Sequence, residues 1–188
     1  MQELMDAERV TYWGISEADE ATLRRAHAVC PVTAVQNRYS MMARQYESLF
    51  PALEELGIGL VCFSPLGRGY LTGTLSQDTQ FSSSDVRASM PRFRSPEALG
   101  ANQAIVALVR QYAAEKGCTP ASSPGLADGA KLGSSPFRAP PNSTGSRRPG
   151  CGPGLFLPEE LSAVQAALDQ IPIHGARYND QPGALVER

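Results

Sequence analysis

Cysteine and histidine are scarce in this chain of 188 residues, which holds four cysteines and two histidines. The cysteines lie far apart and form no C-x-x-C pair, so neither a zinc site nor a disulfide framework is indicated. Because His27 and His174 are the only histidines, a histidine-rich metal site is excluded. We therefore expect reduced thiols in a cytoplasmic protein, and no metal site. The cysteines are Cys30, Cys62, Cys118 and Cys151.

Strong net charge and long apolar runs are missing as well. The formal net charge is -2, which gives the chain no overall attraction for nucleic acid or for an anionic membrane. No run approaches the roughly 18 apolar residues of a membrane-spanning helix, and the start MQELMDAERV lacks the apolar core of a signal peptide. A hydrophobic fraction of 42% suits one soluble globular domain or a piece of a larger one. We predict neither a nucleic-acid nor a membrane partner.

Strand-like apolar runs alternate with helical patterns in the first third of the chain. Strands are predicted over VTYWG (10–14), VTAVQ (32–36) and IGLVCF (58–63), the last as a strand covered on both faces. Helices are predicted between them over 18–29 and 47–57. Ser16 is the expected N-cap of the first helix, and Gly57 the left-handed end of the second. This rhythm is typical of parallel α/β architecture, either a barrel or a doubly wound sheet.

A long polar loop and two further helices are predicted downstream. The loop covers 74–96, and loops of that length are functional lids about as often as plain surface insertions. A long amphipathic helix follows over 96–117, and Pro158 opens a C-terminal helix. One face of the long helix carries Ile105, Leu108, Val109 and Tyr112.

The stretch FSPLGRGYLTG (63–73) directly follows the third predicted strand. Its glycines Gly67, Gly69 and Gly73 are one residue too widely spaced for G-x-G-x-x-G, and no G-x-x-x-x-G-K-[ST] motif is present. On spacing alone, the stretch is a strand-to-loop turn that needs glycine. Phosphate binding by its backbone N–H groups and arginine is the second interpretation.

Three motifs, in this order and spacing, resemble the aldo-keto reductases. They are YWGIS, VTAVQNRYS and ELGIGLVCFSPLGRGYLTG, and the likeness is greatest to the branch with pyridoxal reductases and plant auxin-induced-like proteins. AAEKGCTPA and QIPIHGARY are similar to that branch too. The resemblance implies an α/β fold, a partial (β/α)8 TIM barrel. Residues 1–121 would be the C-terminal half-barrel, and 155–188 a C-terminal helix and tail.

The resemblance also implies a binding site for NADP(H) at the carboxyl ends of the strands. Ser16 and Gln36 would hydrogen-bond the nicotinamide carboxamide, and Phe63 would lie against the nicotinamide ring. The residues that would line the pyrophosphate are Ser64, Leu66 and Arg68.

Each of these residues also has a plainer interpretation. Ser16 could serve only as a helix cap, Phe63 as ordinary core and Arg68 as ordinary surface, whereas Gln36 is expected as a buried amide at a strand end. Two positions depart from the family pattern. Glu17 stands where the family usually has asparagine, so it lacks the amide donor, and Phe63 replaces a common tyrosine.

The activity that the resemblance implies is NADPH-dependent reduction of an aldehyde or ketone to an alcohol. The family's catalytic aspartate, tyrosine, lysine and histidine lie before the region that matches Met1, so no catalytic residue is assigned here. We expect a truncated oxidoreductase that lacks its catalytic half, with an open fold and weak cofactor affinity. The alternative is a non-catalytic fragment, either a pseudogene product or an interaction module. The substrate would be a small-molecule carbonyl compound, and the oligomeric state is left open.

Residues 122–154 differ from the rest in being rich in proline, glycine and serine without any period. Codons for 124–130 read one base forward, and for 132–148 read one base backward, permit the family's next helix and phosphate-binding loop. We therefore interpret 122–154 as a disordered, out-of-frame segment. A flexible linker is the second interpretation, and a basic nucleic-acid arm of four scattered cations is the third.

Overall fold

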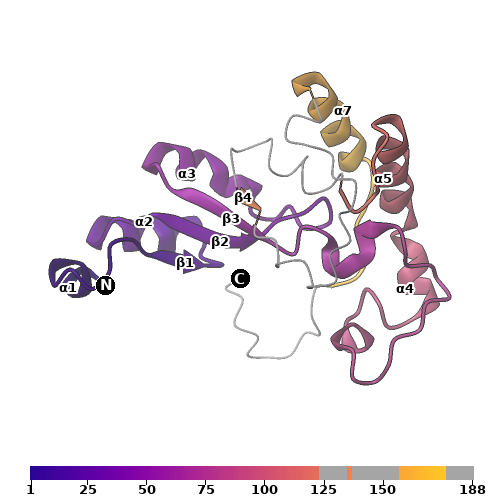
Figure 1. Cartoon of the computed structure of the whole chain (residues 1–188), viewed down its shortest axis with the longest axis horizontal. Helices are drawn as coiled ribbons and strands as arrows, with labels where there is room; N and C mark the ends of the chain where they lie inside the picture. Colours follow the sequence, from indigo (N-terminus) through magenta and orange to yellow (C-terminus); the bar gives the residue numbers. More distant parts are fainter. Residues whose placement is uncertain (123–134, 137–156, 177–188) are drawn as a thin grey trace.

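The computed structural model describes residues 1–122, 135–136 and 157–176. Four strands form one parallel sheet in the order β1-β2-β3-β4 (Figure 1). They are β1 (Gly14–Ser16), β2 (Ala34–Arg38), β3 (Gly59–Phe63) and β4 (Ser135–Pro136). The predicted parallel α/β class is therefore confirmed.

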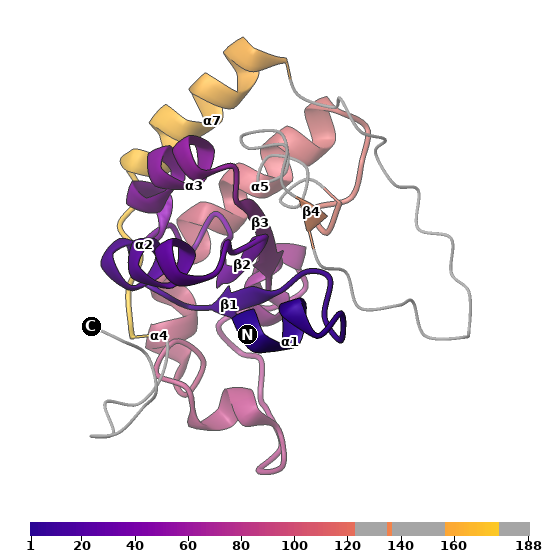
Figure 2. The ribbon, with the colours of Figure 1, turned by 90° about the vertical axis from the view of Figure 1, so that its left-hand side faces the viewer.

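Helices return the chain between the strands and extend the molecule beyond them. Figures 1 and 2 show α2 and α3 on the same side of the sheet, and α5 beside α7. In Figure 1, α4, α5 and α7 lie on the side toward which the strands run. The helices are α1 (Gln2–Asp6), α2 (Glu20–Val29), η1 (Glu47–Leu49), α3 (Phe50–Leu56), η2 (Gly67–Thr72), η3 (Val86–Ser89), α4 (Pro96–Ala101), α5 (Gln103–Glu115) and α7 (Pro158–Asp169). In the described part of the chain, none of these is long and apolar enough to cross a membrane.

The first strand begins later than predicted, so the prediction over 10–14 is wrong. β1 starts at Gly14, and the Tyr12 side chain is 73% exposed. Pairing with β2 begins at Gly14 opposite Ala34, where a Cβ on Gly14 would lie 2.6 Å from the Ala34 carbonyl oxygen. Although VTYW has high β-propensity, the strand forms only where the chain comes close enough to β2 to pair with it.

Ser16 does not cap α2. It is the last residue of β1, and the cap is Asp19, whose Oδ1 accepts a hydrogen bond of 2.7 Å from Thr22 N. Ser16 still pairs with Gln36 in the sheet, and three residues follow it before α2 begins at Glu20. An aspartate is as good a cap as a serine, so the local sequence offers both positions.

Helix ends at glycine and proline are confirmed, but the long helix is not continuous. Gly57 ends α3 in the left-handed conformation, with φ of 65°, and α7 begins at Pro158. The predicted helix over 96–117 is divided into α4 and α5 at the buried Asn102. The Asn102 side chain bonds the backbone of His174 through both amide atoms, at 3.0 and 2.8 Å. This distant partner could not be read from helical periodicity.

The segment predicted to be out of frame contributes one short strand. β4 pairs in parallel with β3, with Ser135 opposite Val61 and Pro136 opposite Cys62. Apart from β4 and Ser122, the predicted segment 122–154 lies outside the described residues.

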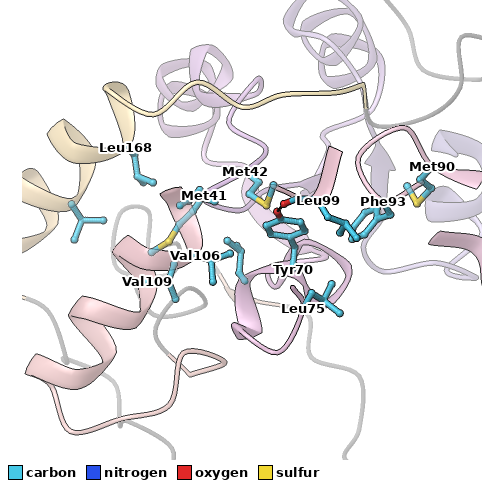
Figure 3. Packing of buried hydrophobic residues seen from close by; sticks show 13 residues of the cluster. Met41, Met42, Tyr70, Leu75, Met90, Phe93, Leu99, Val106, Val109 and Leu168 are labelled. Atoms are coloured by element: carbon cyan, nitrogen blue, oxygen red, sulfur yellow. Dashed lines mark hydrogen bonds between the residues drawn. The ribbon is translucent and has the colours of Figure 1, made fainter. Parts of the chain in front are cut away.

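Two hydrophobic clusters hold the described residues together. The sheet cluster lies between the strands and α2 and α3, and it consists of Leu23, Val32, Val35, Tyr39, Leu49, Ala52, Leu53, Ile58, Leu60 and Cys62. The turn cluster joins η2 to α4, α5 and α7, and its members include Met41, Met42, Tyr70, Leu71, Leu75, Met90, Phe93, Leu99, Ile105, Val106, Val109, Val164 and Leu168. Figure 3 shows Tyr70 in the middle of the turn cluster, among Met42, Leu99 and Phe93.

The sheet is well covered on only one face in the described structure. Along β3, Leu60 and Cys62 are buried in the sheet cluster, whereas Val61 and Phe63 on the other face are partly exposed. The expectation that β3 is covered on both faces is therefore wrong for these residues. The less covered face carries the polar side chains of Ser16 and Gln36, which are exposed.

Leu23→Ala tests the sheet cluster. The Leu23 side chain is 0% exposed, so its truncation should lower the free energy of unfolding by about 2–5 kcal/mol. Val29→Ala on the same helix is the control, because Val29 is 76% exposed and should change that free energy by less than about 0.5 kcal/mol. Urea denaturation followed by circular dichroism measures both. Equal losses in the two variants would contradict the assigned packing of α2.

Candidate functional site

The carboxyl ends of β1, β2 and β3 form one polar rim. Ser16 lies opposite Gln36, and Gln36 lies opposite Val61. Since residues opposite each other in parallel strands point to the same side, Ser16 and Gln36 share the less covered face of the sheet. Two residues further along, Arg38 lies opposite Phe63, the last residue of β3. The pairing thus brings the first three predicted site residues to one end of the sheet.

The backbone carbonyl group of Gln36 links β2 to Ser16 and Glu17 by hydrogen bonds. The Gln36 carbonyl oxygen accepts from Ser16 Oγ and from Glu17 N, each at 3.1 Å. Because the Ser16 hydroxyl proton is used in this bond, Ser16 Oγ can offer a ligand only its lone pairs. Glu17 adopts the left-handed conformation, with φ of 51°, immediately after the strand.

The Gln36 side chain is exposed rather than buried, and it lies at the third of five residues in β2. The expectation of a buried amide at a strand end is therefore wrong on both points. The reason is the open face of the sheet, which leaves the amide directed away from the sheet cluster. An exposed amide offers a ligand both a donor and an acceptor.

The turn after β3 is dominated by left-handed residues. Positive φ values occur at Ser64 (55°), Gly67 (57°), Arg68 (58°), Gly69 (92°) and Gly73 (73°). Gly67 N donates to Ser64 O, and Gly69 N donates to Leu66 O, each at 3.0 Å. These bonds direct the N–H groups of Gly67 and Gly69 into the turn itself and leave neither of them for a ligand. We name residues 64–73 the rim turn.

The other three predicted residues all lie in the rim turn. Ser64, Leu66 and Arg68 are each half-buried, and Phe63 directly before them is half-buried as well. Non-glycine residues seldom adopt φ above zero, so Ser64 and Arg68 hold strained backbone. Such strain is found where the surroundings fix a local geometry, and it often marks a functional turn.

Three charged residues near the rim were not identified from the sequence. Arg38 is 3% exposed and lies on the same face as Gln36, two residues away, so strand alternation could have found it. Asp85 and Arg87 come from the polar loop, which has no period that predicts a contact. Arg87 donates to the carbonyl oxygen of Arg68 at 3.4 Å.

Asp85 and Arg87 form an ion pair that affects the pKa of both groups. Hydrogen bonds from Arg87 lower the pKa of Asp85 from 3.8 to about 2. The same hydrogen bonds raise the pKa of Arg87. The pair therefore stays charged over the whole ordinary pH range.

A cavity of about 470 Å³ lies along the polar loop. It is lined by residues of the segments 77–81 and 93–96 and by Ala88. None of the six predicted cofactor-binding residues lines it. The cavity and the rim are therefore separate features of the surface.

The fold and the rim define a partial parallel α/β barrel with a polar site at the strand ends. Residues 1–123 match the aldo/keto reductase family, so the chain belongs to that family. Aldo/keto reductases are oxidoreductases that generally use NAD(P)H and act on small carbonyl compounds.

Solved structures show the same fold at low sequence identity. A glycerol dehydrogenase from Gluconobacter oxydans is 20% identical with a TM-score of 0.72, over 93% of this chain and 54% of its own length. A thermostable aldo-keto reductase in complex with the inhibitor epalrestat is 16% identical with a TM-score of 0.58, over 89% of this chain and 52% of its own. The chain thus spans about half the length of the solved structures it matches.

Asp85→Asn tests the ion pair through its pH dependence. Because the folded-state pKa of Asp85 is lowered from 3.8 to about 2, its contribution to stability is present above pH 3.8 and is lost as pH falls toward 2. We expect a lower Tm for the variant at neutral pH and convergence with the wild type near pH 2. Thermal unfolding across this range measures the difference. Asp78→Asn, which removes an exposed carboxylate from the same loop, is the control, and an equal profile there would contradict the prediction.

Proposed function

We propose that the rim binds NADP(H), with the nicotinamide at the end of β1 and the adjacent middle of β2, and the pyrophosphate at the rim turn. In this arrangement Ser16 and Gln36 form hydrogen bonds with the carboxamide, and Phe63 lies against the nicotinamide ring. Ser64, Leu66 and Arg68 line the pyrophosphate. The observation that carries the proposal is the parallel register, since it places Ser16 opposite Gln36 and Phe63 two residues beyond the level of Gln36.

The chemistry of the side chains fits this cofactor. The exposed Gln36 amide can both donate to and accept from a carboxamide, and Ser16 Oγ can accept from the carboxamide NH₂. The Arg68 guanidinium supplies a permanent positive charge for phosphate. Glu17 has no amide donor, so we assign it no cofactor contact.

For the activity, we propose carbonyl reduction of the kind the family performs, with NADPH as the hydride donor. The residues of this chain would bind and orient the cofactor, and none of them is assigned a catalytic role. We therefore propose cofactor binding without turnover for the 188 residues by themselves. A cytoplasmic location is part of the same proposal, and it is supported by the cysteines of the described residues, Cys30, Cys62 and Cys118, being thiols.

We also propose that the chain belongs to the branch with pyridoxal reductases and that residues 122–154 are of out-of-frame origin. The family match ends at residue 123, one residue after this segment begins, which supports a change of origin at that point. The domain division follows: a half-barrel over 1–121, the anomalous segment over 122–154, and a C-terminal helix and tail over 155–188.

The nucleotide sequence tests the out-of-frame proposal. Read one base forward over codons 124–130 and one base backward over 132–148, it should encode the helix and phosphate loop typical of the family. The result is expected because compensating single-base shifts, one at each change of frame, alter only the residues between the first shift and the last. Codons that forbid these alternative frames would contradict it.

Titration with NADPH tests the cofactor site. Fluorescence of the cofactor, and of Trp13 as the only tryptophan, reports binding. We expect Gln36→Ala and Arg68→Ala each to weaken NADPH binding about tenfold, the effect of losing about 1.4 kcal/mol. The loss follows from an unpaired carboxamide in one variant and an uncompensated phosphate charge in the other.

Matched controls come from exposed residues away from the rim. Gln80→Ala and Arg25→Ala remove the same side-chain types from the polar loop and from α2, and should leave affinity unchanged. Equal losses in all four variants, or wild-type protein that shows no saturable binding, would contradict the assigned site. Steady carbonyl reduction by the chain alone would contradict the proposed absence of turnover.

A further inference from the structure

One side chain of the polar loop lies directly over the rim turn. Arg87 Nη1 donates to the carbonyl oxygen of Arg68 at 3.4 Å. A Cβ added to Gly69 would lie 3.5 Å from the same Nη1 atom. The guanidinium therefore covers the peptide between Arg68 and Gly69, although 19 residues separate Arg87 from Arg68 along the chain.

Arg87 is itself held from two directions. Its Nε lies 3.0 Å from Asp85 Oδ1, and its Nη2 lies 2.6 Å from Asp85 Oδ2, so the two side chains meet in a bidentate pair. Asp85 Oδ1 also accepts from Arg87 N at 2.9 Å, which caps η3. On the other side, the Arg87 guanidinium carbon lies 4.5 Å from the centre of the Phe81 ring.

The peptide that Arg87 contacts is the strained part of the rim turn. Arg68 has φ of 58° and ψ of 35°, and Gly69 has φ of 92°. A left-handed arginine persists only where neighbouring groups hold it. From the inner side, Tyr70 and Leu71 are fully buried in the turn cluster. Arg87 supplies a hydrogen bond from the outer side.

We propose that Phe81, Asp85 and Arg87 form a latch that holds the rim turn in its binding geometry. Arg87 is then a positioning residue that acts through the Arg68 peptide, and its role in cofactor affinity rests on the proposed function. Asp85 neutralises the Arg87 charge and accepts hydrogen bonds from its Nε and Nη2 atoms. Arg87 therefore acts in the latch without binding phosphate. The loop between η2 and α4 thereby helps to fix the geometry of the binding site.

The Asp85→Asn variant separates the latch from a direct phosphate contact. If Arg87 bound phosphate, removal of the Asp85 charge would release the guanidinium and tighten NADPH binding. The latch predicts weaker NADPH binding instead, because an Arg87 side chain that Asp85 no longer holds leaves the rim turn less ordered. We expect about tenfold weaker binding in Asp85→Asn and in Arg87→Ala.

The cofactor-free protein gives a second readout that does not depend on the proposed function. Hydrogen exchange of amides in residues 64–73, followed by mass spectrometry, should become about tenfold faster in Arg87→Ala than in wild type. Phe81→Tyr, which keeps the ring under the guanidinium, should retain wild-type exchange, whereas Phe81→Leu should not. Arg94→Ala is the control for loss of an exposed arginine from the same loop.

A double-mutant cycle tests whether Arg87 acts on the rim turn through residue 68. Glycine adopts the left-handed conformation without strain, so Arg87→Ala should change exchange in the rim turn far less in an Arg68→Gly background. An additive effect in this cycle, unchanged exchange in Arg87→Ala, or tighter NADPH binding in Asp85→Asn would each overturn the latch. Faster exchange in Arg87→Ala together with no NADPH binding by wild type would support the latch and reject the proposed function. Thermal unfolding of each variant confirms that the comparison is made on folded protein.

Discussion

The parallel register of β1, β2 and β3 is the constraint on which the rest of the structure depends. It places Ser16 opposite Gln36 and Arg38 opposite Phe63, so the polar groups meet at one end of the sheet. The sheet cluster enforces this register, because a slip of one residue would turn Val35, Leu60 and Cys62 out of the apolar layer. Burial on one face of the sheet therefore determines which side chains stand together on the other.

The rim turn is held between a core and a loop. Tyr70 and Leu71 anchor it in the turn cluster, where Tyr70 also donates a hydrogen bond to the carbonyl of Leu99 (Figure 3). Arg87 contacts the opposite side of the same turn. Left-handed backbone at Arg68 is costly on its own, and contacts on both sides of it offset that cost. Anchoring by distant segments thus allows an irregular turn to keep one geometry.

Sequence patterns predicted element types better than element ends. Gly57 as a left-handed helix end, Pro158 as a helix start and a strand near 58–63 depend on local chemistry, and the structure has all three. The strand at 10–14, the Ser16 cap and the unbroken helix over 96–117 were wrong. Each was changed by a partner distant in sequence: Ala34 against Gly14, the Gln36 carbonyl against Ser16, and His174 against Asn102. Motif resemblance named the family, which the match over 1–123 shows.

By itself, the sequence determined the alternation of strands and helices, the glycine-dependent turn after β3 and membership of the aldo/keto reductase family, because these follow from local residue types and their order. Tertiary structure alone decided that Gln36 is exposed, that Arg38 is buried beside Phe63 and that Arg87 lies over the rim turn. The physical reason is that burial and hydrogen bonding of these side chains depend on segments many residues away. No period or spacing within the sequence indicates which distant carbonyl group will accept a hydrogen bond from a given arginine.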